Sequence, residues 1–260
     1  MALGAGEIDA AAFTLLRLFA GAVMLAAISV AMGKPQNVGR GGHWASAFFL
    51  FAYAVCFSFA YLGLTTGTGA LILFGSVQMT MIAAALAKGD RPGTLELLGV
   101  AAAFAGLVYL VLPGLSAPPL SNALLMAAAG AAWGFYTLRG KQSKDPLAET
   151  TGNFVRAVPM MVIAAVPFVG SLQLSARGVV LAVLSGALES GVGYSVWYAA
   201  LKYHTATRAA VLQLSVPVIA AIGGILLLAE SASFRSLIAS LLILGGIAFS
   251  ILTRRPLKTV

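Results

Sequence analysis

The chain has 260 residues, of which 60% are apolar and only 9% are charged, and its mean hydropathy is +0.96. Soluble domains carry roughly 25% charged residues because water-exposed surface requires them, so this composition excludes a soluble globular protein and predicts an integral membrane protein. The net charge of +8 lies in short gaps between apolar runs, which is typical of membrane topology rather than nucleic-acid binding, and the single Cys56 excludes an intrachain disulfide.

A membrane-spanning helix needs about 20 mostly apolar residues. The first apolar run is too long for a signal peptide and lacks a basic segment before it, so we expect it to remain in the mature protein. Nine runs are predicted as transmembrane helices of an all-α polytopic membrane protein: Ala10–Met32, Trp44–Gly63, Gly67–Ala87, Thr94–Pro113, Leu120–Leu138, Asn153–Gly170, Gly178–Ala200, Ala206–Leu228 and Phe234–Thr253.

The basic residues predict the orientation, because Lys and Arg concentrate in cytoplasmic loops. An outside N-terminus leaves only Arg177 and Arg235 in outside segments and Arg17 and Arg156 within spans. The other twelve then lie inside: Lys34, Arg40, Lys88, Arg91, Arg139, Lys141, Lys144, Lys202, Arg208, Arg254, Arg255 and Lys258. We therefore expect a periplasmic N-terminus and a cytoplasmic C-terminus.

The two halves of the sequence predict an internal repeat. A shift of 139 residues places Phe59–Leu62 over Tyr198–Leu201 and Arg17 over Arg156. The first repeat is predicted at 1–113 with four helices and the second at 119–253 with five, followed by a basic cytoplasmic tail at 254–260. Five helices per repeat would give the inverted-repeat plan of many secondary transporters, so the sequence predicts a ten-helix fold that lacks its first helix.

Glu189 is the first functional candidate, because it lies near the middle of a predicted span. A charge there costs about 2.5–3.5 kcal/mol on insertion scales. Removing a carboxylate from water favours its protonated form, which suits reversible proton binding, and the group could also bind a substrate amine. The structural alternative is an ion pair with Arg17 or Arg156. Arg17 is a candidate for binding a substrate carboxylate or for bracing a helix end.

Two glutamines form a second group of candidates. Pro217 cannot donate a backbone hydrogen bond and frees the carbonyl of Gln213. Gln78 occupies the position equivalent to Pro217 in the first repeat, beside Ser76. Broken helices at a repeat interface are where such proteins bind substrates; the alternative is that the amides hold helices together.

Aromatic residues form the third group. Trp133, Tyr136 and Tyr194 are candidates for the walls of a substrate cavity, whereas Trp44 and Trp197 are expected in an interfacial belt. Small pairs such as Gly245-Gly246 are typical of close helix packing.

Several enzyme classes are excluded by missing motifs. The chain has no phosphate-binding G-x-x-x-x-G-K-[ST], no H-E-x-x-H and no G-x-S-x-G, and His43 and His204 both lie in predicted loops. We therefore expect no enzyme activity, no cofactor and no metal site.

The last third of the chain resembles the EamA-type members of the drug/metabolite transporter superfamily. Ser185–Leu201 (SGALESGVGYSVWYAAL) is similar to their eighth helix, and Thr207–Ala221 followed by Glu230 is similar to their ninth. Leu244-Gly245-Gly246 resembles the tenth helix, and Leu15-Leu16-Arg17 resembles the second. The resemblance implies two inverted five-helix repeats, a central cavity, and export or exchange of small molecules such as amino acids. It implies a small or hydroxyl-bearing residue at position 189, so a coupling role for Glu189 rests on its own position.

These observations predict a secondary transporter that exports small metabolites, such as amino acids or drug-like compounds, across a bacterial inner membrane. The alternative is an inactive fragment or a non-transporting partner subunit. The expected partners are a small-molecule substrate and membrane lipid, without nucleic acid, in a monomer or homodimer.

Overall fold

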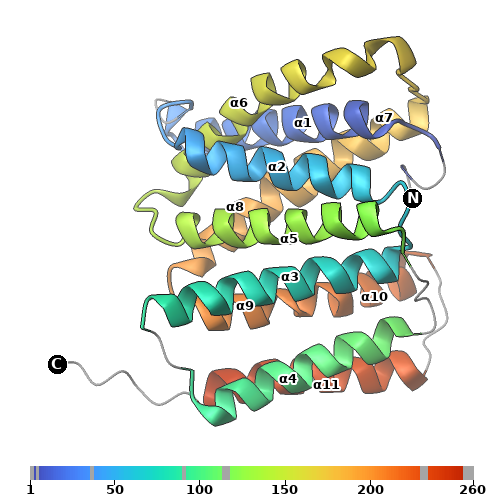
Figure 1. Cartoon of the computed structure of the whole chain (residues 1–260). Coiled ribbons are helices and arrows are strands. Elements are labelled where there is room, and N and C mark those ends of the chain that lie inside the picture. The colour runs from blue at the N-terminus through green and yellow to red at the C-terminus, as the bar shows by residue number, and fades with distance from the viewer. Residues whose placement is uncertain are drawn as a thin grey trace. The chain divides into compact units, whose positions relative to one another are not determined.

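The computed structural model describes residues 3, 6–35, 38–89, 92–112, 118–228 and 234–253. Within them the only β feature is an isolated bridge between Ile8 and Leu174. All other regular structure is helical (Figure 1): α1 Ala10–Ala31, α2 Trp44–Ala60, α3 Thr66–Ala87, α4 Thr94–Val111, α5 Leu120–Gly140, α6 Pro146–Ala165, the 3₁₀ turn η3 Val166–Ser171, α7 Ala176–Leu184, the π-helical segment η4 Ser185–Val192, α8 Gly193–Leu201, α9 Ala206–Gln213, α10 Ser215–Leu228 and α11 Phe234–Leu252.

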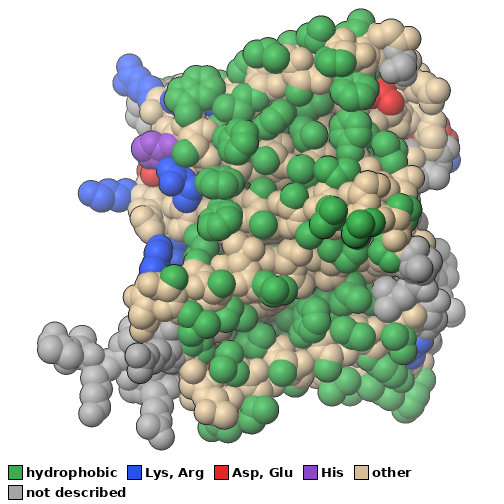
Figure 2. Space-filling model, in the orientation of Figure 1, with side chains coloured by type: hydrophobic (Ala, Val, Ile, Leu, Met, Phe, Trp, Pro, Cys, Tyr) green, Lys and Arg blue, Asp and Glu red, His purple; other side chains and the backbone are tan. Residues whose placement is uncertain are grey.

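Each of the nine predicted apolar runs corresponds to a helical segment, which confirms an all-α polytopic membrane protein. Five helical segments are long and apolar enough to cross a membrane: Ala10–Ala31, Thr66–Ala87, Thr94–Val111, Pro146–Gly170 and Ala176–Leu201. Hydrophobic side chains are spread along the visible face of the molecule (Figure 2), as expected for helices that face lipid. The predicted basic tail at 254–260 and Glu230 lie outside the described residues.

The sixth helix begins earlier than the sequence predicted. It starts at Pro146 instead of Asn153, because Asp145 acts as its N-cap and accepts a hydrogen bond from the Ala148 backbone N–H. An aspartate N-cap followed by proline at the first helical position is a favourable helix start. The loop predicted before this helix was therefore too long.

Two predicted helices are interrupted. The seventh contains a π-helical segment between α7 and α8. The eighth breaks at Leu214 between α9 and α10, as the position of Pro217 predicts. At the break, the Leu214 N–H donates to the Val211 carbonyl instead of continuing the α-helical pattern to Ala210.

The chain divides into two compact units, and each takes helices from both halves of the sequence. Unit 1 contains residues 1–64 and 118–203, and unit 2 contains 65–117 and 204–260. In unit 1, α1 packs against α6, α7, η4 and α2, and α2 packs against α5 and α6. In unit 2, α3 packs against α9, and α4 packs along α11.

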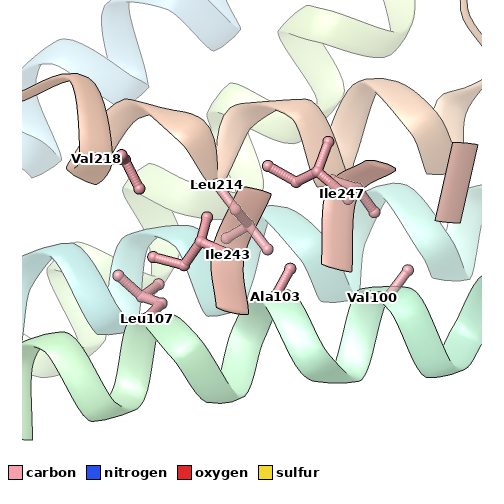
Figure 3. Packing of buried hydrophobic residues seen from close by; sticks show 8 residues of the cluster. Val100, Ala103, Leu107, Leu214, Val218, Ile243 and Ile247 are labelled. Carbon is pink, nitrogen blue, oxygen red and sulfur yellow. The ribbon is translucent and has the colours of Figure 1, made fainter. Parts of the chain in front are cut away.

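The core of unit 2 is apolar and tightly packed. Figure 3 shows Leu214 and Val218 pointing toward side chains from α4 and α11. The buried cluster contains Val100, Ala103, Leu107, Val211, Leu214, Val218, Ile243 and Ile247. Where α4 meets α11, Gly99 and Gly246 allow the two backbones to approach closely: a Cβ built on Gly246 would lie 2.5 Å from the Ala103 nitrogen.

We expect Gly246→Ala to destabilise the protein and Gly245→Ala to be neutral or slightly stabilising. The added methyl at 246 would meet backbone atoms of α4, which cannot rotate away, and overpacking of this kind costs about 1–3 kcal/mol. The neighbouring Gly245 has nothing within 4 Å of its Cβ position, and alanine is the better helix former by about 1 kcal/mol. Thermal unfolding in detergent micelles measures both changes. Equal midpoints for the two variants would contradict this packing.

Candidate functional site

Arg17 is the centre of a polar group inside unit 1. Its side chain is buried on α1 and reaches two other helical elements, α2 and η4. Its Nε donates to Ser190 Oγ at 3.2 Å, and one Nη lies 3.4 Å from the Tyr53 hydroxyl and 3.5 Å from a Glu189 carboxylate oxygen. The guanidinium carbon also lies 5.4 Å from the centre of the Phe57 ring. The fork of the guanidinium therefore joins α1, α2 and η4.

Glu189 is exposed where the sequence analysis expected a buried carboxylate. Its side chain retains 62% of its accessible surface, while that of Arg17 retains 4%. One carboxylate oxygen faces Arg17 and the other accepts a hydrogen bond of 2.8 Å from Ser185 Oγ. The pair is thus asymmetric: the cation is enclosed by the protein, and the anion is open on one side.

The π-helical segment η4 positions Glu189. Within it, Gly186 and Gly191 let α1 approach, since a Cβ on Gly186 would lie 2.3 Å from the Arg17 carbonyl oxygen and one on Gly191 would meet Met24. The wider turn presents Glu189 and Ser190 to Arg17 side by side. Such π segments are rare and frequently occur at functional sites. The sequence analysis did not predict this one.

The three aromatic candidates come together beside this group. The Trp133 ring centre lies 4.8 Å from that of Tyr194 and 5.8 Å from that of Tyr136. Tyr53, which the sequence analysis did not single out, joins the cluster at 5.0 Å from Trp133. Tyr53 therefore connects the aromatic cluster to Arg17. It lies one helical turn before Phe57, which also contacts Arg17, and this spacing is the sequence signal that could have identified Tyr53.

Arg156 lies elsewhere. Its Nη1 donates to the carbonyls of Gly41 and Gly152, at 2.5 and 2.8 Å, and its guanidinium stacks on Trp44 at 5.8 Å. Arg156 therefore ties the loop before α2 to α6, and the ion pair of Glu189 is with Arg17.

The four remaining candidates, Ser76, Gln78, Gln213 and Pro217, belong to unit 2. The Gln78 Nε2 donates to the Ala210 carbonyl at 2.7 Å, and Gln213 Nε2 donates to the Ala209 carbonyl and the Met81 sulfur. Both amides are buried. The break at Leu214 frees the Ala210 carbonyl, so Gln78 supplies the hydrogen bond that the helix no longer makes.

We expect Gln78→Leu to lower the stability of unit 2 by about 1–3 kcal/mol, because the Ala210 carbonyl would remain buried without its donor. Gln78→Glu keeps the shape but offers no amide donor when ionised, and should be no better. Met79→Leu, at a neighbouring position that is 75% exposed, serves as the control. Chemical denaturation in micelles checks the order, and a Gln78→Leu midpoint equal to that of Met79→Leu would contradict it.

Glu96 is a buried acid that the sequence analysis missed. It is 1% exposed in the first turn of α4, and neither carboxylate oxygen has a hydrogen-bond partner among the described residues. It lies one turn before Gly99, on the face that packs against α11. An acid on the same face as Gly99, Ala103 and Gly106 was the signal that could have revealed it.

The comparison with protein families decides what kind of protein carries these groups. The model of the EamA-like transporter family matches residues 120–252, which include α5 to α11. The chain belongs to the EamA-like transporter family. It is therefore a membrane transporter, and the resemblance noted in the sequence is confirmed.

The chain is also similar to individual proteins. An uncharacterized protein of Pseudomonas aeruginosa is 51% identical over 95% of this chain and 86% of its own length. An uncharacterized transporter of Archaeoglobus fulgidus is 28% identical over 76% of this chain and 73% of its own length. A solved crystal structure with 20% identity matches 98% of this chain and 92% of its own, with a TM-score of 0.79, which shows the fold.

Proposed function

We propose that this EamA-like protein is a secondary transporter that exports small metabolites, such as amino acids or drug-like compounds, across a bacterial inner membrane. One observation carries the proposal: a carboxylate in the middle of a spanning segment is 62% exposed while it pairs with an enclosed arginine. A carboxylate facing hydrocarbon costs about 2.5–3.5 kcal/mol, so the open side of Glu189 faces a water-filled path.

In the proposed site, the Arg17–Glu189 pair binds the charged groups of the substrate, and Trp133, Tyr136 and Tyr194 form its wall. A substrate amine binds the open oxygen of Glu189, and a substrate carboxylate competes with Glu189 for Arg17. Proton binding at Glu189 weakens the ion pair and couples the site to a pH gradient. In unit 2, taken by itself, Ser76, Gln78, Gln213 and Pro217 are proposed as substrate-contacting residues.

The repeat and the orientation belong to this proposal. The contacts within unit 1 support a repeat. If α1 is equivalent to α6, and α2 is equivalent to the α7–η4–α8 segment, then the packing of α1 on η4 has its counterpart in the packing of α6 on α2. In unit 2, the proposed equivalents α3 with α9 and α4 with α11 pack as pairs. The inverted repeats 1–113 and 119–253, a periplasmic N-terminus, a cytoplasmic C-terminus and a monomer or homodimer complete the proposed arrangement.

Transport is tested by reconstituting the chain into lipid vesicles loaded with a radiolabelled panel of the standard amino acids and lipophilic cations. Efflux is followed with and without an imposed pH gradient. We expect at least one compound to leave faster than from protein-free vesicles. Efflux equal to that of protein-free vesicles for the whole panel would support the alternative, a non-transporting partner subunit or inactive fragment.

A further inference from the structure

A second polar site lies within unit 1, in a small pocket between the end of α5, the first turns of α6 and the end of α8. It has room for an occupant about the size of a water molecule. Its lining consists of Tyr136, Gly140, Ser143, Pro146, Glu149, Thr150, Asn153 and Tyr198. Two of these residues also contact the aromatic cluster, because the Tyr136 ring packs on Trp133 and the Tyr198 ring packs on Tyr194. The side-chain hydrogen bonds and the ion pair of Arg17 involve none of the eight.

Three hydroxyl groups in this pocket, those of Tyr136, Ser143 and Tyr198, are buried and make no short hydrogen bond among the described residues. The side chains of Asn153 and Thr150 nevertheless lie near the Tyr136 hydroxyl, and that of Thr137 lies near the Tyr198 hydroxyl. The two tyrosines are 1% and 2% exposed, and their rings meet edge to face at 5.4 Å. Leaving a buried hydroxyl without a partner costs about 1–3 kcal/mol, so three in one pocket indicate an occupant that binds oxygen atoms.

The chain makes room for this arrangement at Gly140. A Cβ on Gly140 would lie 2.2 Å from the Tyr198 ring, so only glycine lets that ring lie against the end of α5. The Tyr198 hydroxyl reaches the pocket for this reason.

The charge of the lining selects the occupant. Glu149 is the only charged residue among the eight, and the ion pairs found among the described residues do not include it. The remaining polar groups are hydroxyls and the Asn153 amide, whose oxygen accepts a hydrogen bond from the His43 backbone N–H and has a second lone pair. Oxygen ligands suit hard cations, and divalent sites generally use more than one carboxylate.

We propose that this pocket binds one monovalent cation of about the size of sodium, with Glu149 neutralising its charge and the Tyr136, Ser143 and Tyr198 hydroxyls as oxygen ligands. The bound cation joins the ends of α5 and α8 to the start of α6. This proposal does not depend on the transport proposal, because it concerns cation binding by the resting protein.

The test uses the full chain in detergent micelles and measures the thermal unfolding midpoint in NaCl and in choline chloride at equal ionic strength. Binding to the folded state alone raises the midpoint with cation concentration. We expect a saturable rise of a few degrees in NaCl, and one sodium ion bound per chain in equilibrium dialysis with radioactive sodium.

The variants locate the site. Glu149→Gln should abolish the sodium-dependent rise, and Tyr198→Phe, which removes one hydroxyl and keeps the ring, should raise the half-saturating concentration several-fold. Glu7→Gln is the matched control: Glu7 accepts a hydrogen bond from Ser175 and pairs with Arg177, outside the pocket, so the sodium response should persist. Equal midpoints in NaCl and choline chloride, or an undiminished response in both pocket variants, would overturn the proposal.

Discussion

Arg17→Lys is expected to reduce transport to the rate of protein-free vesicles, although the positive charge is kept. The guanidinium of Arg17 contacts Ser190, Tyr53 and Glu189 at once, at 3.2, 3.4 and 3.5 Å. A lysine ammonium is a compact point charge on a flexible stem and cannot reproduce the planar fork. The substrate-binding pair would lose its geometry, and the joint between α1, α2 and η4 would loosen.

The effect on stability is expected to be smaller than for a fully buried pair. Breaking a buried ion pair costs about 3–5 kcal/mol because the remaining charge is left without solvent. Arg17→Lys keeps both charges, and Glu189 is 62% exposed, so we expect about 1–3 kcal/mol, mainly from the Ser190 and Tyr53 hydroxyls that lose their guanidinium partner.

Arg177→Lys is the control, because Arg177 is 77% exposed and its pair with Glu7 spans 3.8 Å. Exposed pairs contribute about 0–1 kcal/mol, so this variant should transport normally. Both measurements use protein that elutes as a single species in size-exclusion chromatography. Normal transport by Arg17→Lys would show that the arginine only braces the helix.

Glu189→Gln is expected to fold, with reduced stability, and to lose gradient-driven transport. The amide has nearly the same shape, the site is open on one side, and the Ser185 hydroxyl can still donate to the side-chain oxygen. What the variant lacks is the negative charge that pairs with Arg17 and binds a proton. We expect a lower free energy of unfolding, by up to about 3–5 kcal/mol, because Arg17 stays enclosed without its counter-ion, and a transport rate that no longer responds to pH.

The comparison is made in vesicles with and without a pH gradient. Ser185→Ala is the matched control, because it removes the hydrogen bond to Glu189 and keeps the carboxylate. That variant should retain the gradient response at a reduced rate. If Glu189→Gln instead kept the full gradient dependence, the coupling role proposed for Glu189 would be wrong.

Much of the fold was accessible from the sequence. Nine apolar runs and the breakers between them predict the helical segments within a few residues, because lipid requires long apolar helices. The break before Pro217 follows from the missing N–H of proline. The start of α6 was placed late, because the Asp145–Pro146 capping pair was read as part of a loop.

The site was only partly accessible. Arg17 and Glu189 were recognised because charges are rare in spanning segments, but two partners for Glu189 remained possible. The choice of Arg17 depends on the π segment, which changes the helix register without a recognisable sequence pattern. The role of Gln78 was not predictable, because it donates to the carbonyl that the break between α9 and α10 leaves free, and α9 follows Gln78 by more than 100 residues.

The division into two units was also beyond the sequence. Each unit combines helices from both halves, whereas the repeat comparison groups residues along the chain. Which helices share a unit depends on packing details such as Gly99 against Gly246. The sequence does not distinguish such glycines at helix contacts from glycines with open space around them, such as Gly245.

The central claim is that the open side of Glu189 faces a substrate path that opens to either side of the membrane. Its most direct test is a cysteine at Ser185, whose hydroxyl lies 2.8 Å from the Glu189 carboxylate, in a chain whose only native cysteine, Cys56, is replaced by serine. The Cys56→Ser chain alone measures background labelling. A membrane-impermeant thiol reagent is added to oriented vesicles from one side or the other. We predict labelling from both sides, slowed by a transported substrate; labelling from one side only, or from neither, with no effect of any substrate, would contradict the account.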